Sequence, residues 1–192
     1  MKKNLKKINY PKISIITPVL NSKKKIKRCI ESVINQKYPK NKIEHIIIDG
    51  GSRDGTVNII RQYKNRIKYW HSKKDKGLYD AMNIGIKKTT GDIICILNSD
   101  DFFYKNCFKI ISKYFSKNSI DFLFGGVIKS RIYHNFFPEK IWYKFNIYPS
   151  HSVSFFIKKK SHKLIGKYNL KFRHCADRDY LYRAIVIKRL KG

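Results

Sequence analysis

The sequence predicts an α/β fold: a mostly parallel sheet with helices on both faces. Short apolar segments rich in β-branched residues alternate with longer segments whose apolar residues recur every three or four positions. Since parallel strands joined through helices need right-handed crossovers, this alternation places helices on both faces. With 192 residues and 42% hydrophobic content, the chain can bury a two- or three-layer core. We therefore expect a single domain over residues 1–192.

The first half of the chain alternates regularly between strands and helices. Strands are predicted at residues 13–20, 43–49, 67–71 and 92–97. Helices are predicted for the Lys-rich segment containing Ile26, Ile30, Val33 and Ile34, and for residues 56–63 and 77–89. The glycines at 50, 51 and 55 predict a tight turn after the second strand.

The second half is less regular. A helix is predicted at residues 107–115, strands at 121–127 and 152–157, and a final helix at 179–190. Between them, residues 133–148 mix aromatic and basic side chains. We expect this stretch to pack as core, with contact to a lipid-linked acceptor at a membrane interface as the alternative.

The formal net charge of +30 predicts attraction to phosphates without choosing among nucleotides, lipids and nucleic acid. Only 9 of the 43 basic residues are Arg, so sequence-specific nucleic-acid binding is not favoured. Coding bias, with most lysines on solvated faces, explains the lysine content as well as phosphate binding does. The four cysteines lack CxxC spacing, which suggests a reducing compartment. No continuous apolar stretch follows the N-terminal lysines. A cytoplasmic protein is expected, with peripheral contact with the inner face of an anionic membrane left open.

Two adjacent carboxylates, Asp100 and Asp101, follow the predicted strand at residues 92–97. Like charges at the end of a buried strand are costly unless a cation or a proton occupies the site. Mn²⁺ and Mg²⁺ take oxygen ligands from one or two carboxylates and complete their shell with substrate phosphates, so a nucleoside diphosphate is a natural partner. By itself the motif also fits an Asx-turn.

Two further groups of polar residues lie near strand ends or helix starts. Asp49 ends the second predicted strand, where it can accept a hydrogen bond from a base or a ribose, whereas Asp54 fits a helix-capping role better. Asp80 and Asn83 are three positions apart and share a helix face near a helix start, which favours phosphate. Lys76 would add positive charge there, although a solvated helix face remains the alternative.

Taken together, the segments DGGSRDGT (49–56), DKGLYDAMNIGI (75–86) and GDIICILNSDD (91–101) resemble the family 2 glycosyltransferases of the GT-A fold. The resemblance is closest to the bacterial polysaccharide, colanic-acid-type branch and covers residues 13–104, the expected nucleotide-sugar half with its Rossmann-like sheet. It implies a divalent metal, Mn²⁺ or Mg²⁺, at Asp100 with Asp101 beside it. Asn98 replaces the first carboxylate of the usual DxD motif, which weakens the expected metal affinity. The nucleotide-binding residues that it implies are Thr17, Pro18, Asn21, Asp49, Asp80, Asn83 and Ser99.

Residues 105–192 form the expected smaller acceptor-side region. The segment CADRDYL (175–181) is similar to the family's acceptor-side motif, and the resemblance makes Asp177 the catalytic base. A helix N-cap is the alternative for this residue. His151, within the segment PSH (149–151), is assigned to the acceptor side by the same resemblance.

The sequence thus predicts an inverting glycosyltransferase that moves a sugar from a nucleoside-diphosphate donor to a cell-envelope polysaccharide or a lipid-linked glycan, with UDP favoured over GDP. Inverting transfer needs a carboxylate to take the acceptor's proton. Two alternatives stay open: a basic nucleic-acid-binding protein, and a nucleotide-binding relative without efficient transfer. The second follows from the expectation that relatives continue beyond residue 192 with further acceptor-side helices.

Overall fold

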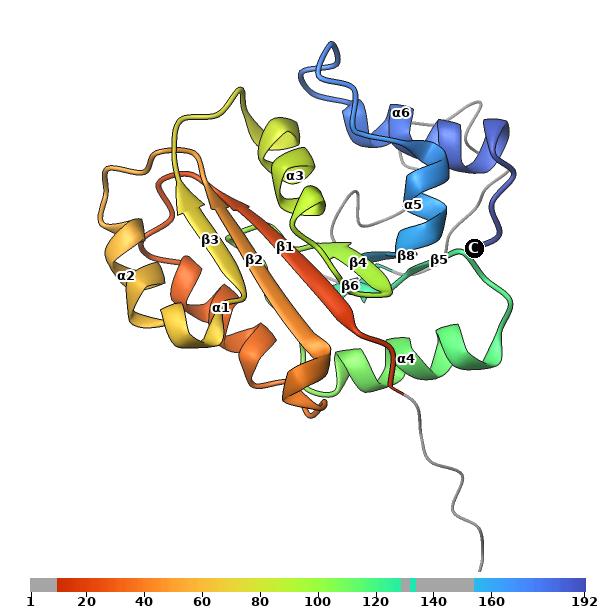
Figure 1. Ribbon diagram of the computed structural model, residues 1–192, viewed down its shortest axis with the longest axis horizontal. Helices are drawn as coiled ribbons and strands as arrows, with labels where there is room; N and C mark the ends of the chain where they lie inside the picture. The colour runs from red at the N-terminus through yellow and green to blue at the C-terminus, as the bar shows by residue number, and fades with distance from the viewer. Residues whose placement is uncertain (1–9, 129–131, 134–153) are drawn as a thin grey trace, which may run out of the picture.

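A six-stranded mixed sheet with helices on both faces forms the centre of the computed structural model, which describes residues 10–128, 132–133 and 154–192 (Figure 1). The strands are β1 (Ile13–Val19), β2 (Ile43–Asp49), β3 (Tyr69–Ser72), β4 (Ile93–Ile96), β5 (Phe122–Phe124), β6 (Val127–Ile128), β7 (Ile132–Tyr133) and β8 (Phe155–Lys158). The helices are α1 (Ile26–Ile34), α2 (Thr56–Gln62), α3 (Leu78–Lys87), α4 (Cys107–Lys117), α5 (Lys159–Ile165) and α6 (Ala176–Tyr182), and a π-helical segment, Arg183–Ile187, continues α6. Short 3₁₀ segments occupy Lys40–Lys42 and Lys64–Arg66.

The strand order in the main sheet is β3-β2-β1-β4-β8-β5. Strands β1 to β4 pair in parallel, whereas β8 is antiparallel to both of its neighbours. The chain leaves β1 toward β2 on one side and returns to β4 on the other, so the strand order reverses at β1. In open α/β sheets, ligands bind beyond the carboxyl ends of the strands at such a reversal. The prediction of a mostly parallel sheet is confirmed.

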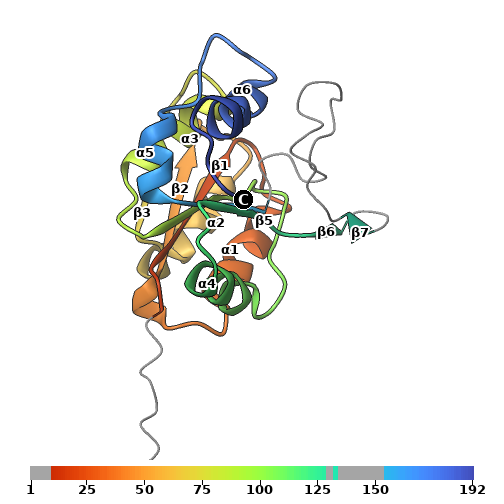
Figure 2. The ribbon, with the colours of Figure 1, turned by 90° about the vertical axis from the view of Figure 1, so that its right-hand side faces the viewer.

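The alternation of side chains along β1 separates two apolar layers. Ile13 and Ile15 face α1, α2 and α4, whereas Ile16 faces α3, α5 and α6. All three isoleucine side chains are fully buried. Figures 1 and 2 show the two groups of helices on opposite faces of the sheet.

The second half differs from the sequence prediction in three places. The strand predicted at 121–127 is broken at Gly125 and Gly126, and β6 pairs instead with β7 in a separate two-stranded sheet. Helix α5 was not predicted, because only two of its seven residues are aliphatic and it follows β8 directly. The last helix begins at Ala176, three residues earlier than predicted. The aromatic stretch at 133–148 lies almost entirely outside the described residues.

A buried carboxylate ties β1, β2 and the turn before β4 together. Glu44 is 1% exposed and accepts hydrogen bonds from the Ser14 hydroxyl at 2.6 Å and the Thr90 backbone N–H at 2.8 Å. The Lys12 ammonium lies 2.7 Å from its other oxygen. Burial alone would raise the pKa of Glu44, but these donors together lower it to about 2.

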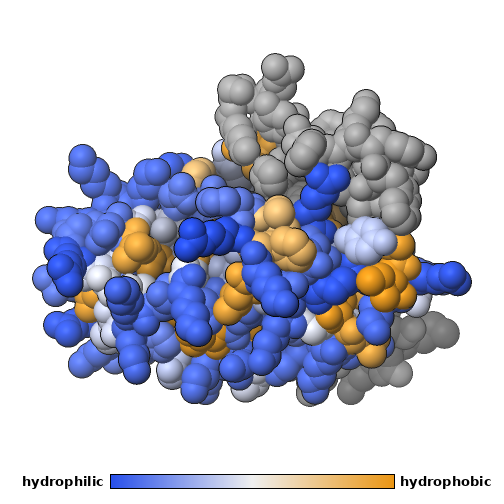
Figure 3. All heavy atoms as spheres, turned by 90° about the horizontal axis from the view of Figure 1, so that it is seen from above, coloured by the Kyte–Doolittle hydropathy of each residue, from blue (hydrophilic) through white to orange (hydrophobic). Residues whose placement is uncertain are grey.

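The surface is mainly hydrophilic when seen from above, with hydrophobic residues in separate patches (Figure 3). Among the described residues, no helix is both long and apolar enough to cross a bilayer. All four cysteines are free: Cys29 and Cys95 are buried, Cys107 is partly buried, and Cys175 is exposed.

Candidate active site

The loops after β1 and β4 enclose an open pocket of about 550 Å³ at the carboxyl ends of the strands. The ammonium of Lys25 lies 3.6 Å from a carboxylate oxygen of Asp100, so the two loops are in direct contact. Three predicted site residues, Asn21, Ser99 and Asp100, therefore share one pocket. Its lining is Leu20, Asn21, Ser22, Lys23, Lys24, Lys25, Asp54, Ser99 and Asp100. The three consecutive lysines make it attractive to an anion.

Asp49 is the anchor of the glycine turn that follows β2. Its buried carboxylate accepts hydrogen bonds from the backbone N–H groups of Gly51 at 3.1 Å and Ser52 at 2.9 Å, and from the Ser72 hydroxyl at 2.6 Å. Gly51 and Gly55 have φ values of +94° and +96°, where a side chain would be strained. Both carboxylate oxygens thus have partners inside the protein, since the Ser52 hydroxyl donates to the other oxygen. Base binding by Asp49 stays a prediction.

Asn21 joins this turn to the loop after β1. Its backbone N–H donates to the Ser52 hydroxyl at 2.7 Å, and its side-chain oxygen accepts from the Arg53 N–H at 2.9 Å. Asp54 accepts from the backbone N–H groups of Lys23 and Thr56, each at 2.9 Å. The Thr56 hydroxyl, followed by the Lys23 N–H, holds the pKa of Asp54 below its usual range. Asp54 thus fixes the turn before α2 but is not its N-cap, which is Gly55, and the residue also lines the pocket.

Thr17 and Pro18 are buried within β1 and are absent from the residues that line the pocket. The Thr17 hydroxyl lies 2.9 Å from a ring nitrogen of His45. Burial lowers the pKa of His45 to about 3, so the ring is neutral at physiological pH. The Thr17 hydroxyl is therefore engaged by His45 in the core. This placement gives no support to the prediction that Thr17 binds a nucleotide.

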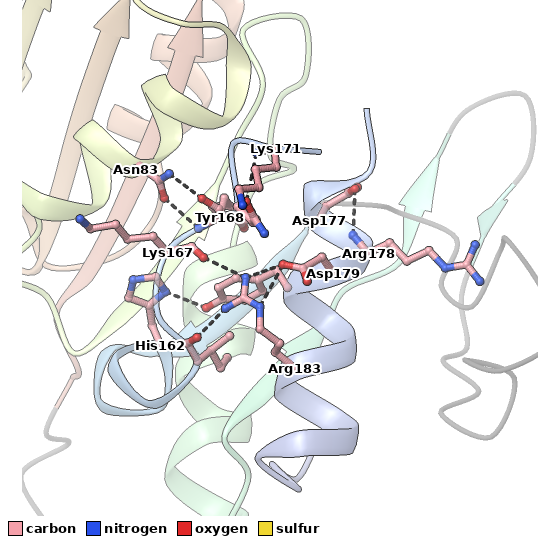
Figure 4. A network of polar contacts seen from close by, with 12 residues as sticks. Asn83, His162, Lys167, Tyr168, Lys171, Asp177, Arg178, Asp179 and Arg183 are labelled. Atoms are coloured by element: carbon pink, nitrogen blue, oxygen red, sulfur yellow. Dashed lines mark hydrogen bonds and ion pairs between the residues drawn. The ribbon is translucent and has the colours of Figure 1, made fainter. Parts of the chain in front are cut away.

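Asp80 and Asn83 lie near the start of α3 but have different tasks. A carboxylate oxygen of the partly exposed Asp80 accepts from the Lys76 N–H at 3.0 Å. Asn83 is only 7% exposed, and its amide forms two 2.9 Å hydrogen bonds with the backbone N–H and C=O of Tyr168 (Figure 4). Asn83 thus links α3 to the segment between α5 and α6, a role that its position in the motif did not reveal.

The Asn98–Asp101 segment forms a turn in which the Asp101 N–H donates to the Asn98 carbonyl at 3.0 Å. The Asp100 side chain is 54% exposed toward the pocket. In the described part of the chain, the buried side-chain oxygen of Asn98 has no hydrogen-bond partner. The side chains of Asn98, Asp100 and Asp101 all offer oxygen atoms, which are the ligands that Mg²⁺ and Mn²⁺ prefer. Among the described residues, no three His, Cys, Asp or Glu side chains converge on one point.

Asp177 lies in the first turn of α6, on the opposite face of the sheet from α4. One of its oxygens accepts from the Tyr79 hydroxyl at 3.1 Å and from the Arg178 N–H at 3.0 Å. Burial, together with the charge of Asp177, raises the pKa of Tyr79 to about 12, so the phenol remains a donor. The helix N-cap is Cys175, which argues against the capping alternative for Asp177. His151 lies outside the described residues.

A series of stacked aromatic side chains joins α3, α5 and α6, beginning at Tyr79, the residue that donates to Asp177. The ring centroids are 5.7 Å apart for Tyr79 and Tyr168, 4.6 Å for Tyr168 and Tyr180, and 5.7 Å for Tyr180 and His162. Arg183 pairs with Asp179 in the same network (Figure 4). Sequence reasoning missed the role of Tyr79, although this residue lies inside the second motif.

Comparison with curated proteins finds relatives over most of the chain. An uncharacterized glycosyltransferase of Mycobacterium tuberculosis is 33% identical over 186 residues, covering 92% of this chain and 70% of the relative. A PGL/p-HBAD biosynthesis glycosyltransferase of Mycobacterium bovis is 29% identical over 182 residues, covering 90% and 69%. The poly(ribitol-phosphate) β-N-acetylglucosaminyltransferase TarP of Staphylococcus aureus is 32% identical over 117 residues, covering 59% and 36%.

Solved structures share the fold. Staphylococcus aureus TarS in complex with UDP-GlcNAc superposes with a TM-score of 0.73 at 20% identity, covering 90% of this chain and 53% of TarS 1–349. A Pyrobaculum calidifontis mannosyltransferase in complex with GDP-Man and Mn²⁺ gives a TM-score of 0.72 at 17% identity, covering 93% and 53%. The chain thus spans about half the length of these structures and has their GT-A fold. Residues 14–183 match the sequence profile described as Glycosyl transferase family 2. The chain belongs to glycosyl transferase family 2.

Proposed function

We propose that this protein is an inverting glycosyltransferase whose donor is a nucleoside-diphosphate sugar, with UDP favoured over GDP. The pocket shared by Asn21, Ser99 and Asp100 carries the proposal, because it lies where the strand order reverses and is lined by three lysines. The complexes of TarS with UDP-GlcNAc and of the mannosyltransferase with GDP-Man and Mn²⁺ support it.

On the donor side, Asp100 and Asp101 would hold a divalent cation, Mn²⁺ or Mg²⁺. Such a cation neutralises charge on the diphosphate. Lys23 and Lys24 line the same pocket, and their positive charge would stabilise the negative charge that develops on the leaving diphosphate. Asp49 and Asn21 support donor binding by fixing the turn beside the pocket.

On the acceptor side, Asp177 is the proposed general base. It takes the proton of the acceptor hydroxyl while that oxygen attacks the anomeric carbon from the face opposite the leaving diphosphate. The Tyr79 hydroxyl holds the carboxylate in place. The proposed acceptor is a cell-envelope polysaccharide or a lipid-linked glycan, which the mycobacterial and TarP relatives support, and His151 is proposed to lie near it.

Release of nucleoside diphosphate from UDP-GlcNAc and GDP-Man, with and without Mn²⁺, tests this function. We expect Asp177→Asn to lower the release rate by about 10²- to 10⁴-fold while nucleotide affinity is retained. Glu31→Gln, an isosteric change on α1 away from the pocket lining, is the control and should match the wild type. Nucleotide binding without release from either donor would support the alternative of a relative without efficient transfer.

A further inference from the structure

The outer face of α4 exposes lysines together with large apolar side chains. Ile110 and Tyr114 are 53% and 50% exposed, and Tyr104, just before the helix, is 60% exposed. The opposite side of α4 is ordinary core, with Phe108 fully buried and Ile111 only 4% exposed. We call the outer set the α4 surface; it consists of Tyr104, Lys105, Lys109, Ile110, Lys113 and Tyr114.

The charge of this region has one sign. Residues 102–120 contain four lysines and no Asp or Glu. The band continues onto α1, because the Arg28 guanidinium lies 3.4 Å from the ring centroid of Phe102, whose ring is 5.5 Å from that of Tyr104. A surface of this kind attracts anions and also offers apolar side chains that water solvates poorly.

An apolar groove of about 300 Å³ connects the α4 surface to the candidate metal motif. Asp101 lines this groove together with Ile110 and the 52% exposed Ile128. Its remaining lining is mainly apolar and includes Leu97, Phe103, Ile111 and Val127, together with Tyr104 and Lys105 of the α4 surface. The groove and the α4 surface are therefore one continuous feature.

We propose that the α4 surface docks on an anionic lipid bilayer. A bilayer has anionic headgroups that attract Lys105, Lys109 and Lys113. It also has an apolar layer in which Ile110 and Tyr114 can be buried. Nucleic acid would offer phosphates but no apolar layer for the isoleucine. One consequence rests on the proposed function: an acceptor anchored in the same bilayer meets the groove that leads to Asp101.

Co-sedimentation of the whole chain with vesicles tests this proposal. We expect binding to vesicles of phosphatidylcholine with about one third phosphatidylglycerol, no binding to pure phosphatidylcholine, and weakening as salt is raised. Lys109→Glu/Lys113→Glu should weaken binding at least about tenfold, because it reverses two positive charges that face the anionic headgroups. The separate variant Ile110→Ser should also weaken vesicle binding relative to the wild type, although it leaves the charge unchanged.

Lys64→Glu/Lys68→Glu is the matched control, because it makes the same charge change on exposed lysines at the β3 edge of the sheet. If this control weakens binding as much as the α4 variant, net charge alone is responsible and the docking surface is wrong. Equal binding to single-stranded RNA and to vesicles, or no binding to vesicles, also overturns the proposal. Nucleotide binding, measured in parallel, reports on the donor site independently of these outcomes.

Discussion

Replacing Asn83 with Ala tests whether this residue holds the segment between α5 and α6 onto α3. The change removes two buried hydrogen bonds of 2.9 Å to the backbone of Tyr168, a residue that is itself only 5% exposed. Each backbone group left unpaired in the interior costs about 1–3 kcal/mol. We therefore expect the free energy of unfolding to fall by about 2–6 kcal/mol, a large part of the ~5–15 kcal/mol typical of a domain.

Urea unfolding followed by circular dichroism measures this loss. With a urea dependence of about 2 kcal/mol per molar, the midpoint should fall by about 1–3 M. Lys87→Ala, an exposed change on the same helix, should alter stability by less than about 0.5 kcal/mol. A loss below about 1 kcal/mol for Asn83→Ala would refute the reasoning. If nucleotide affinity fell instead while stability was kept, Asn83 would be a ligand-binding residue, as its motif first suggested.

Three further predictions concern other parts of the structure. Glu44→Gln should cost about 3 kcal/mol at pH 7, because the carboxyl pKa in the folded protein lies near 2 instead of 4.5. This stabilisation is present above pH 4.5 and is lost as the pH falls toward 2, so urea unfolding curves of wild type and variant should converge there; curves that stay parallel contradict the assignment. Gly85→Ala should destabilise by about 1–3 kcal/mol in thermal unfolding, since its Cβ would lie 2.3 Å from Ile16 Cγ2; an unchanged melting temperature would show that this contact relaxes freely. Tyr79→Phe should lower kcat about 10- to 100-fold with donor affinity unchanged, because one hydrogen bond to the carboxylate of Asp177 is lost; an unchanged kcat would remove Tyr79 from the proposed mechanism.

The first half of the fold was predictable because its strands are continuous apolar runs and its helices carry a clear apolar face. β2 has the predicted bounds, and the buried residues Ile26, Ile30 and Val33 of α1 are ones that the periodicity selected. Helix α5 was missed because its buried residues include Ser161 and His162, whose polar groups are satisfied by partners far along the chain. Local sequence does not show such partners.

The candidate site, too, could be predicted only in part from the sequence. Three of the predicted residues, Asn21, Ser99 and Asp100, lie in one pocket at the carboxyl ends of the strands, since parallel strands bring their following loops to one edge, while their roles stay predictions. The motifs could not show that the Asn83 amide is occupied by Tyr168, 85 positions away. A polar residue in a motif is compatible with both ligand binding and support, and only the tertiary contacts distinguish the two.

Calorimetric titration of the protein with UDP in the presence of Mn²⁺ tests the central claim most directly. The account predicts UDP binding that weakens when Mn²⁺ is omitted and that falls at least about tenfold in Asp100→Asn, the loss expected for a direct ligand of the metal–diphosphate complex. Glu31→Gln should bind as the wild type does. Absence of binding by UDP and by GDP, with Mn²⁺ present and the protein folded, would contradict the account.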